Sequence, residues 1–432
     1  MQTRFSPAQL ADPDMASSEA VIRKCVHCGF CTATCPTYVI LGDELDSPRG
    51  RIYLMKEMLE GERQPTAEVV KHIDRCLSCL SCMTTCPSGV NYMHLVDHAR
   101  AYIEERYQRP LSERVIRWLL AKVLTHPKRF RMALEWARRV KPLEPRLRRY
   151  ALTKPLAAML ALTPSVLPRK PVRIGRYLYP NKGRVILLQG CAELVLQPEV
   201  RSAAARLIFG AGYDVNLASG EVCCGALVHH MGRKDEALDF ARRNIDAWMA
   251  EIEGEGVAAI VITASGCGTS IKDYGFMLRD DPAYAEMAAK VSALAKDVCE
   301  FLAEIELAPV TNPVGLRIAY HAACSLQHGQ KITEAPKALL RRAGYEVVTP
   351  VDAHLCCGSA GVYNILQPEL AEAIGARKVE TLDRLDADVI AAGNVGCATQ
   401  IALKAKAPVL HVVQLLDWAH GGIRPPSLTI KP

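Results

Sequence analysis

The chain has 432 residues, half of them hydrophobic and 23% charged, which is the composition of a globular protein with two or three domains. Aromatic residues make up only 6% and are thinly spread, so the composition does not indicate a surface for stacking nucleic-acid bases. The net charge of +7 is uneven, because residues 106–184 carry +18 and the rest of the chain −11, a pattern typical of a basic segment that faces a partner.

The seventeen cysteines are the feature of the composition that most narrows the possible functions of the protein. The first 15 residues lack the apolar core and cleavage site of a secretory signal, and apolar runs such as 156–167 are too short or interrupted to cross a bilayer. We therefore expect a protein that stays in the cytosol. Thiols are kept reduced there, so metal or cluster ligation explains the cysteines better than disulfides do.

The first block, residues 1–109, contains two copies of the pattern Cys-x2-Cys-x2-Cys-x3-Cys-Pro, which is typical of bacterial two-cluster ferredoxins. Three cysteines of a motif cap three corners of one cubane, and the fourth, which precedes proline, reaches the other cubane. We therefore predict two [4Fe–4S] clusters. Cluster 1 would be held by Cys25, Cys28, Cys31 and Cys86, and cluster 2 by Cys76, Cys79, Cys82 and Cys35.

Structural zinc sites are the alternative for this block, but zinc ribbons use pairs of cysteines rather than three evenly spaced cysteines and a fourth before proline. Since thiolates fill all eight positions, His27 and His72 are expected at the surface or in helix caps.

The 40 residues between the motifs are long for a minimal ferredoxin, and their apolar residues recur at helical steps. We expect a helical insert here, similar to that of the iron–sulfur subunits of succinate dehydrogenase. Arg49 and Arg51 are expected to pair with the nearby acidic residues Asp43, Glu44 and Asp46.

Residues 110–182 form the basic segment, which contains no cysteine and is interrupted by nine prolines. Helical periodicity is clear over 111–124 and 130–140. We expect a helical linker whose arginine-rich surface contacts an anionic membrane or an acidic face of a partner protein; a solvated linker is the alternative. The segment has no nucleic-acid-binding motif.

The remaining block is an internal repeat, with a first half at 183–312 and a second half at 313–432. In each half a cysteine precedes a Cys-Cys-Gly sequence by 32 residues, and a Gly-Cys sequence follows. Strand-like runs such as 316–321 alternate with helical periodicity such as that at 335–342, which predicts parallel α/β units with the cysteines near the carboxyl ends of strands. The predicted fold is therefore a helical two-cluster ferredoxin domain followed by a duplicated α/β domain.

Each half offers four thiolates to a shared metal centre, and the glycine lets the backbone approach it closely. Buried structural thiols are the alternative. Four nearby histidines, His229, His230, His321 and His354, could supply or tune a ligand, although satisfied core histidines are more common, and Cys299 is expected in the core. The candidate sets are Cys191, Cys223, Cys224 and Cys267 in the first half, and Cys324, Cys356, Cys357 and Cys397 in the second.

This double-cysteine repeat resembles the CCG domain of heterodisulfide reductase-type subunits, which can bind an iron–sulfur cluster. Ala264 and Asn394 stand where the fullest family pattern has a further cysteine. The resemblance therefore leaves four-thiolate clusters, zinc and vestigial sites open, and a disulfide reductase activity is a second interpretation. A zinc-stabilised scaffold without redox function is a third.

Over nearly its whole length the chain resembles the iron–sulfur subunit of bacterial glycolate oxidase (glycolate dehydrogenase). The resemblance rests on CVHCGFCTATCP at 25–36, GDEL at 42–45, PRGRIY at 48–53, ASGCG at 264–268 and HLCCGSAG at 354–361. The cluster motifs alone are shared with subunits of anaerobic glycerol-3-phosphate dehydrogenase and with lactate-utilisation subunits, which are the alternative assignments.

The resemblance implies partner subunits that bind FAD and oxidise glycolate to glyoxylate. Electrons would then pass through this chain to a quinone pool at the cytoplasmic face of the inner membrane. The sequence lacks a Gly-x-Gly-x-x-Gly fingerprint, so we expect no FAD or NAD and no catalytic substrate site on this chain, and no nucleic acid as a partner.

Overall fold

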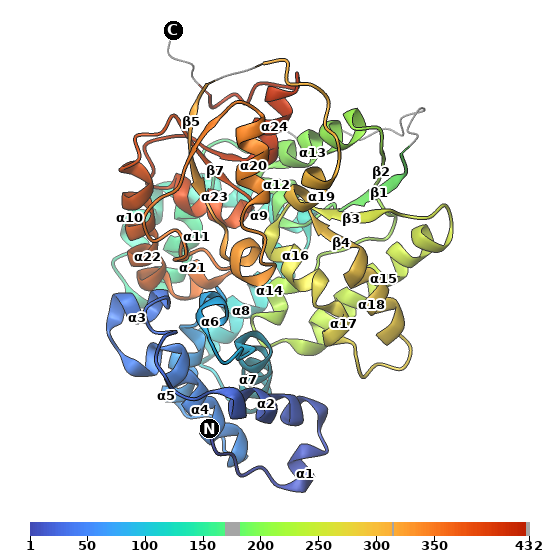
Figure 1. The fold of residues 1–432 in the computed structure, drawn as a ribbon. Helices are drawn as coiled ribbons and strands as arrows, with labels where there is room; N and C mark the ends of the chain where they lie inside the picture. The colour runs from blue at the N-terminus through green and yellow to red at the C-terminus, as the bar shows by residue number, and fades with distance from the viewer. Residues whose placement is uncertain (169–181, 313–314, 429–432) are drawn as a thin grey trace.

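The N-terminal part of the chain and the part that contains the two repeats fold differently. The computed structural model describes residues 1–168, 182–312 and 315–428, which are helical as far as residue 162 and form parallel sheets flanked by helices from residue 184 onward. The N-terminal helices lie at one end of the molecule, and the two α/β units lie at the other (Figure 1). Within the described residues, we find no helix with the length and apolar character needed to cross a membrane.

The N-terminal domain is a set of helices around the two cysteine motifs. Helix α2 begins after Asp12, whose carboxylate accepts hydrogen bonds from two backbone N–H groups, and α4 begins after Ser47, whose hydroxyl accepts one from Gly50. Proline occupies the first position of both helices. The predicted helical insert is formed by α4 and α5. The helices are α1 (Pro7–Leu10), α2 (Pro13–Lys24), α3 (Pro36–Leu41), α4 (Pro48–Glu60), α5 (Ala67–Asp74), α6 (Ser81–Thr85) and α7 (Tyr92–Arg106), with a 3-10 turn at Glu44–Asp46.

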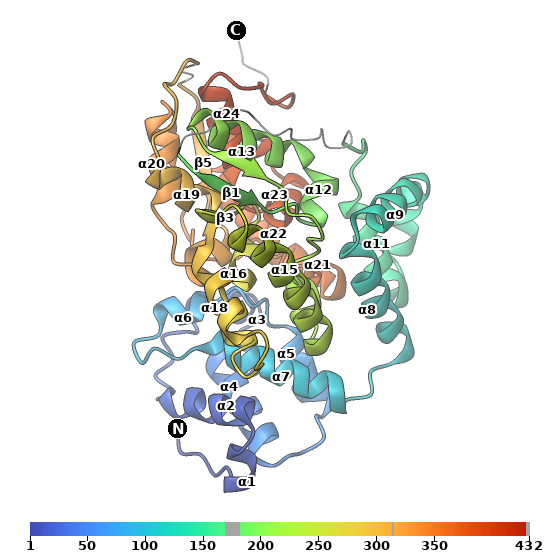
Figure 2. The same ribbon diagram turned by 90° about the vertical axis from the view of Figure 1, so that its right-hand side faces the viewer.

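The basic segment forms a separate group of helices along the side of the α/β units (Figure 2). The prediction for 111–124 matches α8, while α9 begins three residues earlier than predicted because Pro127 serves as its first residue. Arg117 anchors the group by donating to the Met231 carbonyl at 2.9 Å. The helices are α8 (Leu111–Leu124), α9 (Pro127–Val140), α10 (Glu144–Leu147) and α11 (Lys154–Leu162).

Each repeat contains a four-stranded parallel sheet with the same strand order, β2-β1-β3-β4 in the first and β6-β5-β7-β8 in the second. Apart from Arg184 at the start of β1, the residues of the central strands β1, β3 and β7 are apolar and buried, as expected where helices cover both faces. The strands are β1 (Arg184–Leu187), β2 (Asp214–Asn216), β3 (Ala259–Ile262), β4 (Ala295–Asp297), β5 (Arg317–His321), β6 (Glu346–Val348), β7 (Val389–Ala392) and β8 (Val409–His411).

Helices α13 and α24 pack against each other, and one hydrophobic core contains residues of both sheets. The two repeats therefore pack into a single unit with a shared hydrophobic core rather than into two separate domains. The helices of the first repeat are α12 (Ala192–Leu196), α13 (Pro198–Gly210), α14 (Ala226–His229), α15 (Lys234–Glu253), α16 (Ser265–Lys272), α17 (Tyr274–Met277), α18 (Ala285–Leu294) and α19 (Val298–Glu304). Those of the second are α20 (Ala335–Arg342), α21 (Tyr363–Leu366), α22 (Pro368–Asp383), α23 (Val395–Ala402) and α24 (Val412–Ala419), with a π-helical turn at Ser325–Gly329.

Candidate metal centres

The two N-terminal motifs adopt the same backbone path. In each motif the residue before the second cysteine and the residue after it have positive φ angles: His27 and Gly29 in the first, Ser78 and Leu80 in the second. Left-handed backbone is costly for residues other than glycine, so its recurrence at matching positions indicates that the loop shape is required. The loops curl so that the thiols of one motif can converge.

Cysteines from both motifs meet around cluster 1's predicted position. A pocket there is lined by Cys25, Cys28 and Cys31 of the first motif, and by Cys82 and Cys86 of the second. Burial raises the pKa of the Cys25 thiol, and the charges of Cys86 and Cys28 act in the same direction. Burial likewise raises the pKa of Cys31 to about 11. Crowded thiols with raised pKa values are stabilised when a metal replaces their protons, so this set fits a cluster.

The predicted ligands of cluster 2 also converge. Burial raises the pKa of the Cys79 thiol well above its usual range, and the charges of Cys324, Cys35 and Cys76 raise it further. Burial does the same to Cys82, with contributions from Cys79, Cys76 and Cys35. Cys35 therefore lies with the second motif although it belongs to the first. The ligand assignment of both clusters stays a prediction, and the chemistry of each set suits it.

A buried ion network surrounds Cys35. Arg51 is 1% exposed, and it donates to the Asp46 carboxylate at 3.2 Å and the His72 carbonyl at 2.7 Å, while one of its N–H groups faces the Cys35 sulfur at 3.8 Å. The predicted pairing of Arg49 with Glu44 and of Arg51 with Asp46 is confirmed. The expectation for His72 is wrong: it is buried, because its Nδ1 pairs with Asp46 at 3.0 Å.

Two residues that the sequence did not single out also contact Cys76, a predicted ligand of cluster 2. Arg100 of α7 donates to the Cys76 carbonyl and to the Ser78 hydroxyl, both at 2.6 Å, and the Tyr92 hydroxyl donates to the Cys76 sulfur at 3.7 Å. Apart from their place on the helix after the second motif, the sequence contains no signal that would have identified Arg100 and Tyr92.

The second repeat packs directly on the loop of the second motif. Leu77 and Cys79 share a hydrophobic cluster with Cys324, Cys356 and other residues of that repeat. Polar contacts join the same surfaces, because Thr84 hydrogen-bonds with His328 at 2.8 Å and the Tyr363 hydroxyl donates to the Arg75 carbonyl at 3.1 Å. The loop that carries Cys79, a proposed ligand of cluster 2, is therefore covered by the second repeat.

The first repeat meets the N-terminal domain through charged pairs and through the stacking of His94 on Phe276. Asp97 of α7 lies 3.3 Å from His229 Nε2, and His94 lies 2.9 Å from Asp273. Asp14 of α2 pairs with Lys234 and with Arg279. The two repeats therefore differ in how they contact the cluster domain, although their sequences are duplicated.

Within each repeat the structure brings the four predicted cysteines together. In the first repeat, the Cys191 and Cys223 sulfurs are 3.3 Å apart, and Cys224 interacts with both Cys223 and Cys267. The second repeat has the same chain of contacts, from Cys324 through Cys356 and Cys357 to Cys397. Cys299, expected in the core, is buried on α19 away from both sets.

Glycine after each cysteine pair permits this convergence. Gly225 and Gly358 have φ angles of +80° and +85°, and a Cβ on Gly358 would lie 2.5 Å from the Ala371 carbonyl oxygen. The chain can therefore turn sharply against α15 in the first repeat and α22 in the second, which directs both neighbouring thiols inward.

Comparisons with known proteins agree with this architecture. Residues 24–90 match the model of the 4Fe-4S dicluster domain, and residues 185–272 and 318–402 match that of the cysteine-rich (CCG) domain. The chain is 40% identical over 419 residues to the glycolate oxidase iron-sulfur subunit of Escherichia coli (strain K12), covering 97% of this chain and 99% of that protein. It is 32% identical over 428 residues to the probable glycolate oxidase iron-sulfur subunit of Bacillus subtilis (strain 168), covering 93% and 95%.

One solved structure is also similar. The crystal structure of a hypothetical protein from Helicobacter pylori aligns with 96% of this chain and 74% of its own, with a TM-score of 0.58 and 12% sequence identity. This likeness shows a shared fold.

Proposed function

The chain belongs to the family of glycolate oxidase iron–sulfur subunits, and from this we propose that it carries electrons from glycolate, oxidised to glyoxylate on a partner FAD subunit, toward a quinone-type acceptor. One observation supports the proposal: cysteines of the two distant motifs lie together, because Cys86 of the second motif interacts with Cys25 of the first, and Cys35 of the first interacts with Cys79 of the second. The whole-length match to two glycolate oxidase subunits supports glycolate over the alternative assignments.

We propose that residues 1–109 hold both clusters. Cys25, Cys28, Cys31 and Cys86 would ligate cluster 1, and Cys76, Cys79, Cys82 and Cys35 would ligate cluster 2. Bound [4Fe–4S] clusters supply one-electron carriers. The protein stabilises their thiolates with donors, among them the Ser78 N–H at 3.4 Å from the Cys76 sulfur. Of the four-cysteine sets of the two repeats, which were both predicted as possible further sites, we propose the set of the second repeat as an additional ligand set.

A contact surface for the flavin partner lies at cluster 1. Cys28 is exposed, and the apolar side chains of Val26 and Phe30 on either side of it are 66% and 62% exposed. Exposed apolar side chains beside an accessible redox centre are suited to a partner that must approach closely to exchange electrons. We propose that the FAD subunit binds here.

The basic segment carries a second exposed surface. Of the 20 large hydrophobic side chains exposed among the described residues, 12 lie between residues 111 and 166. They include Trp118 on α8 and Trp136 on α9, and the segment is rich in arginine. Exposed tryptophan and aliphatic side chains among basic residues suit the interface of an anionic membrane. We propose that this surface holds the chain at the cytoplasmic face of the inner membrane.

Between this surface and cluster 2 lies a cavity of about 440 Å³. Cys76 and Leu77 line one side of it, and Ile116, Leu152 and Tyr363 belong to the remainder of its lining. The lining mixes apolar side chains with charged ones such as Arg100 and Arg117, and a mixed cavity that links a cluster ligand to a membrane-facing segment suits a quinone ring with its polar carbonyl oxygens. We propose this cavity as the place where the acceptor approaches.

Reconstitution tests the proposed function. The chain purified without oxygen should contain about eight iron and eight sulfide for the N-terminal clusters, and alone it should not oxidise glycolate. With the FAD subunit present, glycolate should reduce the clusters. Glycolate oxidation by the isolated chain, or clusters that glycolate cannot reduce in the complex, would contradict the proposal.

Vesicle sedimentation tests the membrane surface. The wild-type chain should bind vesicles of phosphatidylglycerol and phosphatidylcholine more strongly than vesicles of phosphatidylcholine alone, and a W118Q/W136Q variant should bind less. Equal recovery of both proteins with the anionic vesicles would favour an acidic protein partner for this surface.

A further inference from the structure

We propose that His321 completes a thiolate–imidazole metal centre with Cys357 and Cys397 in the second repeat, and that the first repeat has no equivalent centre. One ring nitrogen of His321 and the two sulfurs all lie within 4.8 Å of one another, and all three side chains are buried. Among the described residues, the first repeat contains no three histidine, cysteine or acidic ligand atoms this close together. The spacing is that of ligands around one metal ion.

The hydrogen bonding of His321 sets it apart from a core histidine. It is 0% exposed, and neither Nδ1 nor Nε2 has a hydrogen-bond partner. His411, equally buried in the same repeat, uses both nitrogens: Nε2 bonds the Thr263 carbonyl at 2.9 Å, and Nδ1 accepts from the Val413 N–H at 3.2 Å. Buried polar groups are almost always paired, so an unpaired imidazole facing two thiols indicates a missing ligand.

The matching position in the first repeat does not hold a residue that can bind a metal. His321 and Leu188 each lie three residues before the first cysteine of their set, at the carboxyl end of the matching strands β5 and β1. Leucine offers no ligand, so the duplicated cysteines of the first repeat lack the imidazole.

A second difference lies on the helix behind the cysteine pair. Gly225 packs on Ala237 of α15 and Gly358 packs on Ala371 of α22, and seven residues further on stand Asn244 and Lys378. Lys378 is 2% exposed and donates to the Asp352 carbonyl at 2.9 Å.

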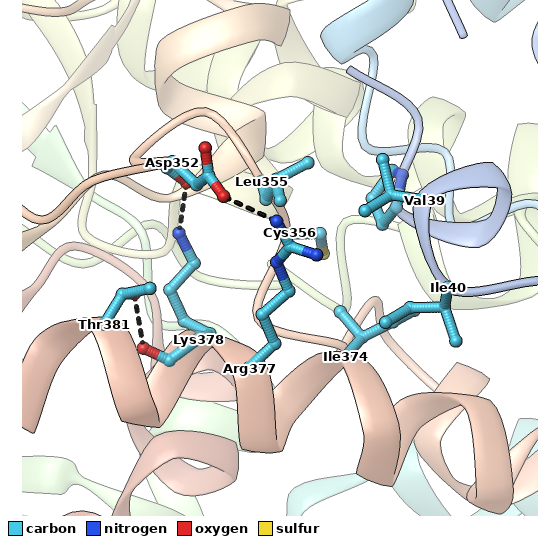
Figure 3. Close-up of a pocket in the computed structure, with 10 residues that line it drawn as sticks. Val39, Ile40, Asp352, Leu355, Cys356, Ile374, Arg377, Lys378 and Thr381 are labelled. Carbon is cyan, nitrogen blue, oxygen red and sulfur yellow. Dashed lines mark hydrogen bonds and ion pairs between the residues drawn. The ribbon is translucent and has the colours of Figure 1, made fainter. Parts of the chain in front are cut away.

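Figure 3 shows Lys378 reaching from α22 toward Asp352, with Cys356 nearby and Val39 and Ile40 of the N-terminal domain across the pocket. The lysine also interacts with the charges of Cys324, Cys357 and Cys356. A buried cation here offsets the negative charge that thiolates carry once a metal has displaced their protons.

A third difference is a donor to the sulfur itself. Asn394 replaces the further cysteine of the fullest family pattern, and its side-chain N–H faces the Cys397 sulfur at 3.7 Å. Ala264 stands at the matching place in the first repeat and offers no donor. Histidine, lysine and asparagine therefore surround the second set, which also adjoins Cys79 of cluster 2.

Zinc and iron share this ligand chemistry, so the test measures both. Wild-type chain purified without oxygen should hold metal beyond the eight N-terminal irons, either as zinc or as additional iron. His321→Leu, which copies the first repeat, should lose that excess and keep the eight irons and sulfides, which also report that the chain has folded. Cys299→Ala, which removes a buried cysteine outside both sets, should retain all the metal.

A second variant separates ligation from packing. His321→Cys supplies a thiolate in place of the imidazole and should recover the excess metal. X-ray absorption at the zinc edge, or nitrogen coupling in pulsed EPR for iron, should show one imidazole in the wild type and none in His321→Cys. A wild type with no excess metal, or a His321→Leu chain with undiminished excess and an unchanged imidazole signal, would overturn the proposal. Loss of the eight N-terminal irons would instead contradict the proposed function.

Discussion

Replacing Arg51 should destabilise the N-terminal domain more than any surface substitution near it. Its guanidinium is buried with the Asp46 carboxylate, the His72 carbonyl and the Cys35 sulfur, so Arg51→Met removes the charge and three sets of contacts together. Breaking a buried ion pair costs about 3–5 kcal/mol. Asp46 keeps Arg75 at 2.7 Å and His72 at 3.0 Å, so we expect the lower end, about 3 kcal/mol of the free energy of unfolding.

The matched control is Arg49→Met, two residues away. Arg49 and Glu44 form an exposed pair, with side chains 32% and 46% accessible, and such pairs contribute about 0–1 kcal/mol. Chemical denaturation without oxygen, followed by cluster absorbance and by circular dichroism, measures both variants. Arg51→Lys keeps the charge without the planar fork and should fall between Arg51→Met and the wild type.

The same substitution should shift one reduction potential. A positive charge 3.8 Å from the Cys35 sulfur stabilises the more negative, reduced state, so its loss should make the midpoint of cluster 2 more negative and leave cluster 1 nearly unchanged. Redox titration followed by EPR reports this. If Arg51→Met matched Arg49→Met in both stability and midpoint potentials, the assignment of Cys35 to a cluster beside the Arg51 network would be wrong.

Three further predictions concern the clusters and their contacts. Cys35→Ala should lower bound iron to about half while the EPR signal of cluster 1 persists, whereas loss of both signals would show that the two sites fold as one. Phe30→Gln should slow cluster reduction by glycolate in the complex at unchanged iron content; an unchanged rate would place the flavin contact elsewhere. Burial opposes protonation of His229, but the Asp97 carboxylate outweighs it and raises the pKa of His229 in the folded protein. The His229–Asp97 pair therefore stabilises the folded state fully below about pH 6.5, and this contribution is lost as the pH rises through the raised pKa. Stability measured from pH 6 to 9 should therefore decline in the wild type and less so in His229→Gln, and parallel profiles would refute the role of this pair.

Local features of the fold could be predicted from the sequence because each has a local cause. The predicted strand at 316–321 matches β5 to within one residue, since a buried apolar run leaves a strand little freedom of position. The predicted helix at 335–342 matches α20. The loops of the two cysteine motifs could also be predicted, because the cubane sets the spacing of its ligands along the chain.

Long-range features could not be predicted. Nothing in the periodicity of either segment indicates that Cys79 and Cys324, which lie in different domains, come together, because that contact depends on how finished domains pack. The burial of His72 was missed because it follows from Asp46, 26 residues earlier, turning inward. His321 was one of four similar histidines in the sequence, and only the structure shows that both its nitrogens are unpaired and that it lies beside Cys357 and Cys397.

The unequal contacts of the two repeats argue that duplication of the cysteines did not duplicate their role. The first repeat is attached to α2 and α7 by ion pairs such as Asp14 with Arg279 at 2.8 Å, and its cysteines sit in a hydrophobic cluster formed with α8 and α21 rather than with the cysteine motifs. The second repeat places its cysteines in one hydrophobic cluster with the loop of cluster 2. Electron transfer depends on proximity, whereas charged contacts serve to hold and orient. A metal centre held by the second repeat would therefore lie near the predicted ligands of cluster 2, whereas the first repeat would hold the cluster domain in place through its ion pairs.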